Sequence, residues 1–120
     1  MLGRVTQIHV EYFQEMALLP AANAWSGTPW RADPAKVGGA ATTADIGTHA
    51  HHLGCFISGL EMTRLRAEFH TLGAAQPLED TAFFQVRYAG GVPGTILISQ
   101  AMAGAQCGLR PLNASQMPFC

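Results

Sequence analysis

The sequence predicts an α+β fold: a mainly antiparallel, open β-sheet with one principal helix packed on one face. One strand pattern lies near the start of the chain, one helical pattern lies in the middle, and three strand patterns follow on short connections. Consecutive strands joined by short loops pair antiparallel, and a sheet with one apolar face is completed by a helix on that face.

The first strand is predicted over residues 4–12, where apolar or β-branched side chains at Thr6, Ile8, Val10 and Tyr12 alternate with the residues between them. Residues 13–41 have no clear periodicity and contain several prolines and the pair Gly38-Gly39. A segment of this length without regular structure is typical of a functional loop.

The helix is predicted over residues 42–58. Thr42 or Thr43 can cap its start, and Asp45 in the first turn suits the helix dipole. Gly59 is a plausible stop. The spacing predicts a stripe of core-facing side chains, which are Ile46, Ala50, Leu53 and Ile57.

Three further strands are predicted over residues 62–71, 80–88 and 94–103, and Gly90-Gly91 indicates a hairpin between the last two. The sheet face away from the helix would carry Arg64, Arg66, Gln85 and Arg87. The domain is predicted to span residues 1–108. Residues 109–120 form a tail without periodicity, in which two prolines oppose a strand, and we expect it to be poorly ordered.

Composition restricts the classes of function. The 120 residues are 48% hydrophobic and only 12% charged, and a surface so poor in charge predicts contact with a partner. A net charge of −1 without a Lys/Arg-rich segment excludes a nucleic-acid-binding class. The three cysteines form no CxxC pair, which indicates free thiols. No signal peptide and no apolar run of about 20 residues is present, so we expect a cytoplasmic protein.

A polar cluster occupies the first half of the predicted helix. Asp45 and His49 are one helical turn apart and His52 continues their face, whereas His51 points away. A carboxylate beside an imidazole can orient the ring and raise its proton affinity, which suits removal of a proton from an alcohol as hydride leaves its carbon. Asp45 and His49 are therefore candidate catalytic residues, and His52 is a candidate substrate contact.

Two other interpretations of this cluster stay open. Spacing alone slightly favours Asp45 as a helix cap and the histidines as surface residues. Asp45 with two histidines on one face could also bind zinc, but the chain has no HExxH motif or nearby cysteine pair, so a metal site ranks third and none is expected.

The loop before the helix holds a second candidate site. Trp30 and Arg31 could bind a polar ligand such as a sugar, with hydroxyls on the guanidinium and a sugar face on the indole. The alternative, in which Trp30 anchors the loop and Arg31 pairs with Asp33, is favoured by the residues alone. Glu11 is a weaker candidate, and Cys55 is expected to be a small core residue. No GxGxxG or Walker motif is present, so no cofactor is expected for this chain alone.

These features together resemble the C-terminal domain of the glucose–fructose oxidoreductase and inositol 2-dehydrogenase (Gfo/Idh/MocA) family, over roughly residues 3–108. The resemblance is carried by Trp30-Arg31-Ala32-Asp33-Pro34, Gly38-Gly39, Asp45-Ile46-Gly47-Thr48-His49, Gly59-Leu60-Glu61 and Glu79-Asp80-Thr81-Ala82. The DxxxH motif alone is weak, but in this order with the other elements it is fairly specific.

The resemblance implies a role for the chain and its residues. In the family, a preceding Rossmann domain binds NAD or NADP and supplies a catalytic lysine from a Glu-Lys-Pro motif. His49 would be the acid–base residue, Asp45 would position substrate and ring, and Trp30 and Arg31 would border the substrate pocket. The open sheet face commonly forms the subunit interface in the family, so a homo-oligomer is implied.

The chain departs from the family pattern because it has no Rossmann domain and no Glu-Lys-Pro lysine, and its tail does not match. We therefore expect the substrate-side domain of an NAD(P)-dependent oxidoreductase for a sugar, inositol or related polyol, incomplete and inactive alone, which a separate Rossmann-domain partner could complete. The alternative is a non-catalytic sheet domain that acts in dimerisation or partner binding.

Overall fold

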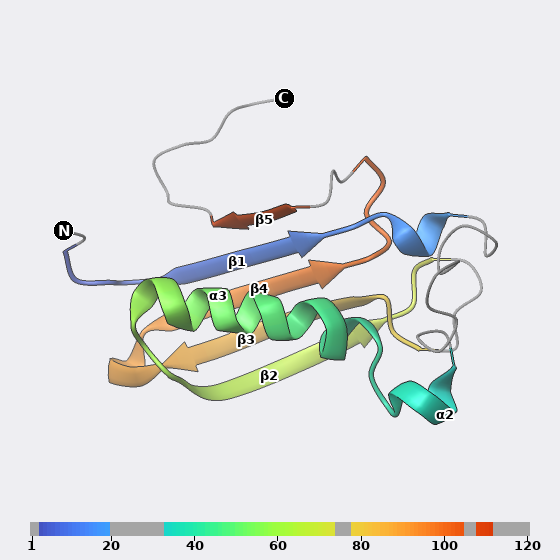
Figure 1. Ribbon diagram of the computed structural model, residues 1–120. Coiled ribbons are helices and arrows are strands. Elements are labelled where there is room, and N and C mark those ends of the chain that lie inside the picture. The colour runs from blue at the N-terminus through green and yellow to red at the C-terminus, as the bar shows by residue number, and fades with distance from the viewer. Residues whose placement is uncertain (1–2, 20–32, 74–77, 105–107, 112–120) are drawn as a thin grey trace.

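The computed structural model describes residues 3–19, 33–73, 78–104 and the backbone of 108–111. In this part of the chain a five-stranded sheet lies under one long helix, as Figure 1 shows. The strand order is β2-β3-β4-β1-β5, and the predicted α+β class with a mainly antiparallel sheet is confirmed. The strands are β1 (Ile8–Phe13), β2 (Met62–His70), β3 (Thr81–Tyr88), β4 (Pro93–Ser99) and β5 (Gly108–Pro111).

The helical elements are η1 (Met16–Leu18), α2 (Pro34–Val37), η3 (Thr43–Gly47), α3 (Thr48–Ser58) and η4 (Ala89–Gly91). The predicted helix is present, but its first turn, η3, is a π-helical turn that continues directly into α3. The predicted hairpin is also confirmed, because Gly90 and Gly91 both adopt positive φ angles, 74° and 77°, between β3 and β4. Without a Cβ, glycine adopts this backbone conformation at little cost.

The first strand occupies a position that the sequence patterns did not predict. β1 pairs in parallel with β4, from Ile8 opposite Gly94 to Phe13 opposite Ser99. A parallel pair needs a long crossover, and here the chain between the two strands includes α3, β2 and β3. As a consequence, the carboxyl ends of β1 and β4 lie at the same end of the sheet.

Gly108–Pro111 correct the prediction that no strand follows residue 108. They form β5, which pairs antiparallel with β1 at the edge of the sheet (Figure 1). Pro111 is the last residue of this edge strand, a position where the missing backbone N–H is tolerated. The rest of the predicted tail, residues 112–120, lies outside the described residues.

The hydrophobic core lies between α3 and the sheet. The predicted stripe is confirmed for Ile46 and Ala50, which are buried, and for Leu53, which packs against the core. Ile57 is 50% exposed, so its assignment to the core is wrong. The buried line of the helix runs through Gly54 instead, because Tyr88 from the end of β3 fills the space beside it.

Tyr88 predicts a fall in stability at alkaline pH. Its side chain is 0% exposed, and burial, with a smaller contribution from the nearby Cys55, raises its pKa from 10.0 to about 12. The unfolded chain loses the phenol proton first, so the stabilising contribution is complete below pH 10 and is lost as pH rises toward 12. The expected loss over this interval is about 2 to 3 kcal/mol. Tyr88→Phe should remove this part of the pH dependence of urea unfolding, and an unchanged alkaline slope would contradict the assignment.

The carboxylate of Asp80 holds the residues that directly follow β2. It is 0% exposed, and its carboxylate accepts hydrogen bonds from Leu72 N at 3.0 Å, Gly73 N at 2.6 Å and Thr81 Oγ1 at 2.9 Å. Asp80→Ala would leave these donors without an acceptor, so we expect the free energy of unfolding to fall by about 3 kcal/mol or more.

Asp33→Ala is the matched control for Asp80→Ala. Asp33 caps the short helix α2 by accepting one hydrogen bond from Ala35 N at 3.0 Å, at a more exposed position. It should cost no more than about 1 kcal/mol in chemical denaturation. Equal losses for the two variants would contradict the special role of the Asp80 carboxylate.

Candidate functional site

A polar cluster lies at the end of the sheet where β1 and β4 terminate. Gln14 follows β1 by one residue, and Gln100 directly follows β4. Because the two strands are parallel, both glutamines lie at the same end, and the start of the long helix brings Thr42 and Asp45 against them. The cluster thus combines residues from three distant parts of the sequence.

Gln100 is at the centre of this cluster and is only 1% exposed. Its Oε1 accepts a hydrogen bond from Thr42 Oγ1 at 2.9 Å. Its Nε2 donates to Gln14 Oε1 at 3.1 Å and to Asp45 Oδ2 at 3.3 Å. One buried amide therefore joins the first strand, the last residue before η3 and the carboxylate of Asp45.

Asp45 projects from the π-helical turn η3. Such turns are rare in proteins and are frequent at functional sites. The prediction that Thr42 or Thr43 caps this helix is wrong. Thr42 makes no capping hydrogen bond, because its hydroxyl donates to Gln100, and Thr43 Oγ1 has no hydrogen-bond partner among the described residues. The carboxylate of Glu79 caps the helix start instead, with Oε2 accepting from Ala41 N and Oε1 from Thr43 N, both at 2.9 Å.

His49 lies one turn beyond Asp45 and is exposed. Its ring centroid is 6.3 Å from that of Tyr12, with the planes tilted by 60°. The hydroxyl of Tyr12 accepts a hydrogen bond from Gln14 Nε2 at 3.4 Å. The polar cluster thus extends from Asp45 through both glutamines to the tyrosine beside His49, with an imidazole open to solvent at its end.

The other candidate residues are placed differently. His52 is exposed and stacks on Phe56, with ring centroids 5.8 Å apart. His51 points elsewhere, as expected, with Nε2 3.5 Å from Cys55 Sγ. Glu11 Oε1 lies at hydrogen-bond distance, 3.0 Å, from His9 Nε2. Trp30 and Arg31 lie outside the described residues, so nothing is added here to their predicted role as substrate contacts.

Sequence patterns did not identify Tyr12, Gln14 or Gln100 as site residues. Each of them is an ordinary residue near the end of a strand, and no local motif marks it. Knowledge that β1 and β4 are parallel would have been the missing signal, because it brings the ends of both strands to the start of the helix. Ligand sites commonly form beyond the carboxyl ends of parallel strands.

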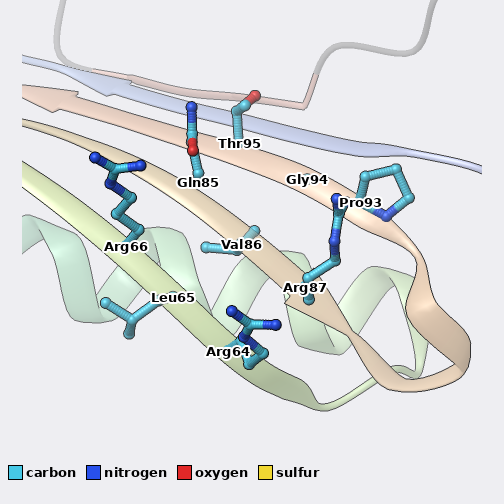
Figure 2. A pocket seen from close by; sticks show the side chains of 9 residues that line it. All are labelled: Arg64, Leu65, Arg66, Gln85, Val86, Arg87, Pro93, Gly94 and Thr95. Atoms are coloured by element: carbon cyan, nitrogen blue, oxygen red, sulfur yellow. The ribbon is translucent and has the colours of Figure 1, made fainter.

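A second surface lies on the open face of the sheet, where a hollow of about 530 Å³ is lined by arginines (Figure 2). Arg64 of β2 lies directly opposite Arg87 of β3, and Arg66 lies opposite Gln85. Among the described ion pairs, none joins a carboxylate to these three arginines. The prediction that the sheet face away from the helix carries Arg64, Arg66, Gln85 and Arg87 is confirmed.

None of the helices in residues 3–19, 33–73 and 78–104 is long and apolar enough to cross a membrane. In the same residues, no three His, Cys, Asp or Glu side chains are gathered in a way that could hold a metal ion.

An open, mainly antiparallel sheet under one long helix defines an α+β domain. Residues 1–113 match the family model described as the GFO/IDH/MocA C-terminal domain, and the chain belongs to this family. The resemblance noted from its motifs is thereby confirmed.

Similar proteins include an uncharacterized oxidoreductase, YfiI, of Bacillus subtilis (strain 168), which is 26% identical over 92% of this chain and 29% of its own length. An inositol dehydrogenase homolog complexed with NAD+ from Azotobacter vinelandii is 26% identical, with a TM-score of 0.78 over 94% of this chain and 30% of its own. An oxidoreductase from Sinorhizobium meliloti is 31% identical, with a TM-score of 0.64 over 89% and 25%. The chain thus spans less than a third of each of these relatives.

Proposed function

We propose that this chain is the substrate-side domain of an NAD(P)-dependent oxidoreductase that acts on a sugar, inositol or related polyol. The observation that carries the proposal is the corner where Asp45, held by Gln100, and the exposed His49 share one polar cluster. An exposed imidazole one helical turn from a hydrogen-bonded carboxylate is suited to exchange a proton with an alcohol near neutral pH. The NAD+ in the Azotobacter vinelandii relative supports a nicotinamide cofactor.

The residues of this chain would bind the substrate and accept its proton, and they would not take part in hydride transfer. As the alcohol is oxidised, the hydroxyl proton passes to the His49 imidazole and Asp45 orients the substrate and the ring. A nicotinamide cofactor would be held by a separate Rossmann domain and would supply the hydride-accepting chemistry. Trp30, Arg31 and His52 remain proposed substrate contacts. The chain alone is expected to bind neither NADH nor NADPH.

Surface composition supports the need for a covering domain on the helix side of the sheet. α3 packs on β1 and β4, whereas Leu65 and Phe69 of β2 are 61% and 54% exposed. An apolar hollow of about 200 Å³ lies between the helix start and this part of the sheet. Exposed apolar groups of this kind mark interaction surfaces.

The test is to join residues 1–113 to the nucleotide-binding domain of the Azotobacter vinelandii relative, in place of its own C-terminal domain. Formation of reduced nicotinamide is measured with myo-inositol and with levoglucosan, and NADH binding verifies that the nucleotide-binding domain is intact. We expect turnover by the joined protein and none by the 120-residue chain. Saturable NADH binding by the chain alone, or no turnover by a joined protein that binds NADH, would contradict the proposal.

A second proposed role is self-association through the open sheet face, and the order of charges along the strands favours it. Paired residues on β2, β3, β4 and β1 form rows across this face. One row consists of Arg66, Gln85, Thr95 and His9. The neighbouring row on the same face, two residues further along each strand, consists of Glu68, Phe83, Leu97 and Glu11. A two-fold axis that lies across the strands between these rows would place Arg66 of one copy opposite Glu68 of the other, and His9 opposite Glu11. A self-complementary surface is what a symmetric dimer requires.

Charge exchange tests this dimer. Arg66→Glu and Glu68→Arg should each weaken self-association at least about tenfold, because they place like charges opposite each other, and the double exchange should restore it. The measurement is analytical ultracentrifugation of each variant, with Lys36→Glu on α2 as the control. Single variants that assemble like the parent would rule out this arrangement of the two copies.

A further inference from the structure

The side chain of Gln100 is buried, and its amide oxygen and both amide hydrogens form hydrogen bonds. The residue is 1% exposed, its Oε1 accepts from the Thr42 hydroxyl, and its Nε2 donates to Gln14 Oε1 and to Asp45 Oδ2. A buried amide that satisfies its oxygen and both amide hydrogens is held in one orientation.

The partners of the amide determine this orientation. A carboxylate has no hydrogen to donate, so the group that faces Asp45 Oδ2 at 3.3 Å must be the NH2 of Gln100. The Thr42 hydroxyl can donate to the remaining oxygen at 2.9 Å, as the structure shows. Rotation of the amide by half a turn would place its oxygen against the carboxylate, which is unfavourable.

The backbone of Gln100 is fixed as firmly as its side chain. Its N–H donates to Asp80 O at 2.7 Å, and its carbonyl oxygen accepts from Ala17 N, also at 2.7 Å. The amide is thus attached to a rigid corner of the sheet, whereas Asp45 projects from a π-helical turn. A fixed donor can therefore select one position for a carboxylate on a less regular element.

We propose that Gln100 is a positioning residue, which holds the Asp45 carboxylate in one orientation relative to His49 through its Nε2 hydrogen bond. This inference rests on the proposed function for its effect on turnover, but the hydrogen bond itself can be tested without turnover. Gln100 touches Asp45 and acts through it.

The first test uses the 120-residue chain labelled with ¹⁵N and ¹³C. The side-chain NH2 signals of Gln100 should shift with pH in step with the carboxyl carbon of Asp45, because the donor senses ionisation of its acceptor. Asp45→Asn should abolish this shift. Glu79→Gln is the control, since it weakens the helix cap but leaves the amide and Asp45 in place, so the shift should persist. An NH2 signal that ignores pH, or that shifts equally in Asp45→Asn, would overturn the proposal.

The second test uses the joined enzyme described above, well below its unfolding temperature. Gln100→Met keeps the side-chain volume but removes all three hydrogen bonds, and we expect kcat to fall about 100-fold, since small displacements of a catalytic group have effects of this size. A Gln100→Met variant with full kcat, beside an inactive Asp45→Asn variant, would overturn the positioning role and leave the proposed function intact. Full kcat in Asp45→Asn would instead contradict the proposed function, and the NMR test would still decide whether Gln100 holds Asp45.

Discussion

His49→Asn is expected to lower kcat of the joined enzyme by about 10²- to 10⁴-fold, the usual contribution of general acid–base catalysis. Asparagine is similar in size and can still form hydrogen bonds, but it cannot accept a proton near neutral pH. His49 is exposed and lies beside Tyr12, so its replacement removes little packing, and the fold should remain as stable as that of the parent. Steady-state kinetics across pH, with unfolding curves for each variant, provide the measurement.

His51→Asn is the matched control for this experiment. His51 is two residues away on the same helix and is also exposed, but it contacts Cys55 instead of the polar cluster. Its replacement should leave kcat within about twofold, as surface changes away from a site usually do. An equal loss for both variants would indicate damage to the helix, and an unchanged rate for His49→Asn would refute its acid–base role.

Alanine substitutions at Gly54 and Gly94, the two glycines beside Tyr88, should each lower the free energy of unfolding. A Cβ at Gly94 would lie 2.7 Å from Tyr88 Cε2 and 2.8 Å from the backbone oxygen of Ile8. A Cβ at Gly54 would lie 2.7 Å from Tyr88 Oη. Overpacking of this kind costs about 1 to 3 kcal/mol, and we expect Gly94→Ala at the upper end because a backbone atom cannot move aside easily.

Tyr88→Phe distinguishes the clash expected for Gly54→Ala from the clash expected for Gly94→Ala. The Tyr88 hydroxyl is buried without a hydrogen-bond partner among the described residues, so its removal should cost little or even stabilise the fold. In the Tyr88→Phe background, Gly54→Ala should lose its clash and gain up to about 1 kcal/mol from the higher helix propensity of alanine. Gly94→Ala should remain destabilising there, because its clashes involve the ring and the neighbouring strand.

Urea unfolding of the three single and two double variants measures this difference as a coupling energy. A positive coupling for Gly54 with Tyr88, and little or none for Gly94 with Tyr88, is the expected result. If the phenylalanine variant rescues neither alanine, or rescues both equally, then the hydroxyl does not account for the glycine at position 54.

Local patterns predicted most of the elements, and the failures have identifiable causes. Alternation located β2, β3 and β4, and the period of the helix placed Ile46 and Ala50 in the core. The helix cap was assigned to a neighbouring threonine because propensity concerns adjacent residues, whereas the actual cap, Glu79, is 36 residues away from Thr43. β5 was missed because Pro111 opposes a strand in general but is accepted at the end of an edge strand.

The sequence by itself determined the α+β class and the family, and it proposed Asp45 and His49 as site residues, because these depend on periodicity and on motifs that are contiguous in the chain. The tertiary structure alone decided which residues surround that pair. Tyr12, Gln14 and Gln100 become neighbours of the helix start only when β1 pairs in parallel with β4, a contact between residues more than eighty positions apart. Pairing over such a distance is governed by the packing of the whole sheet, and no local pattern encodes it.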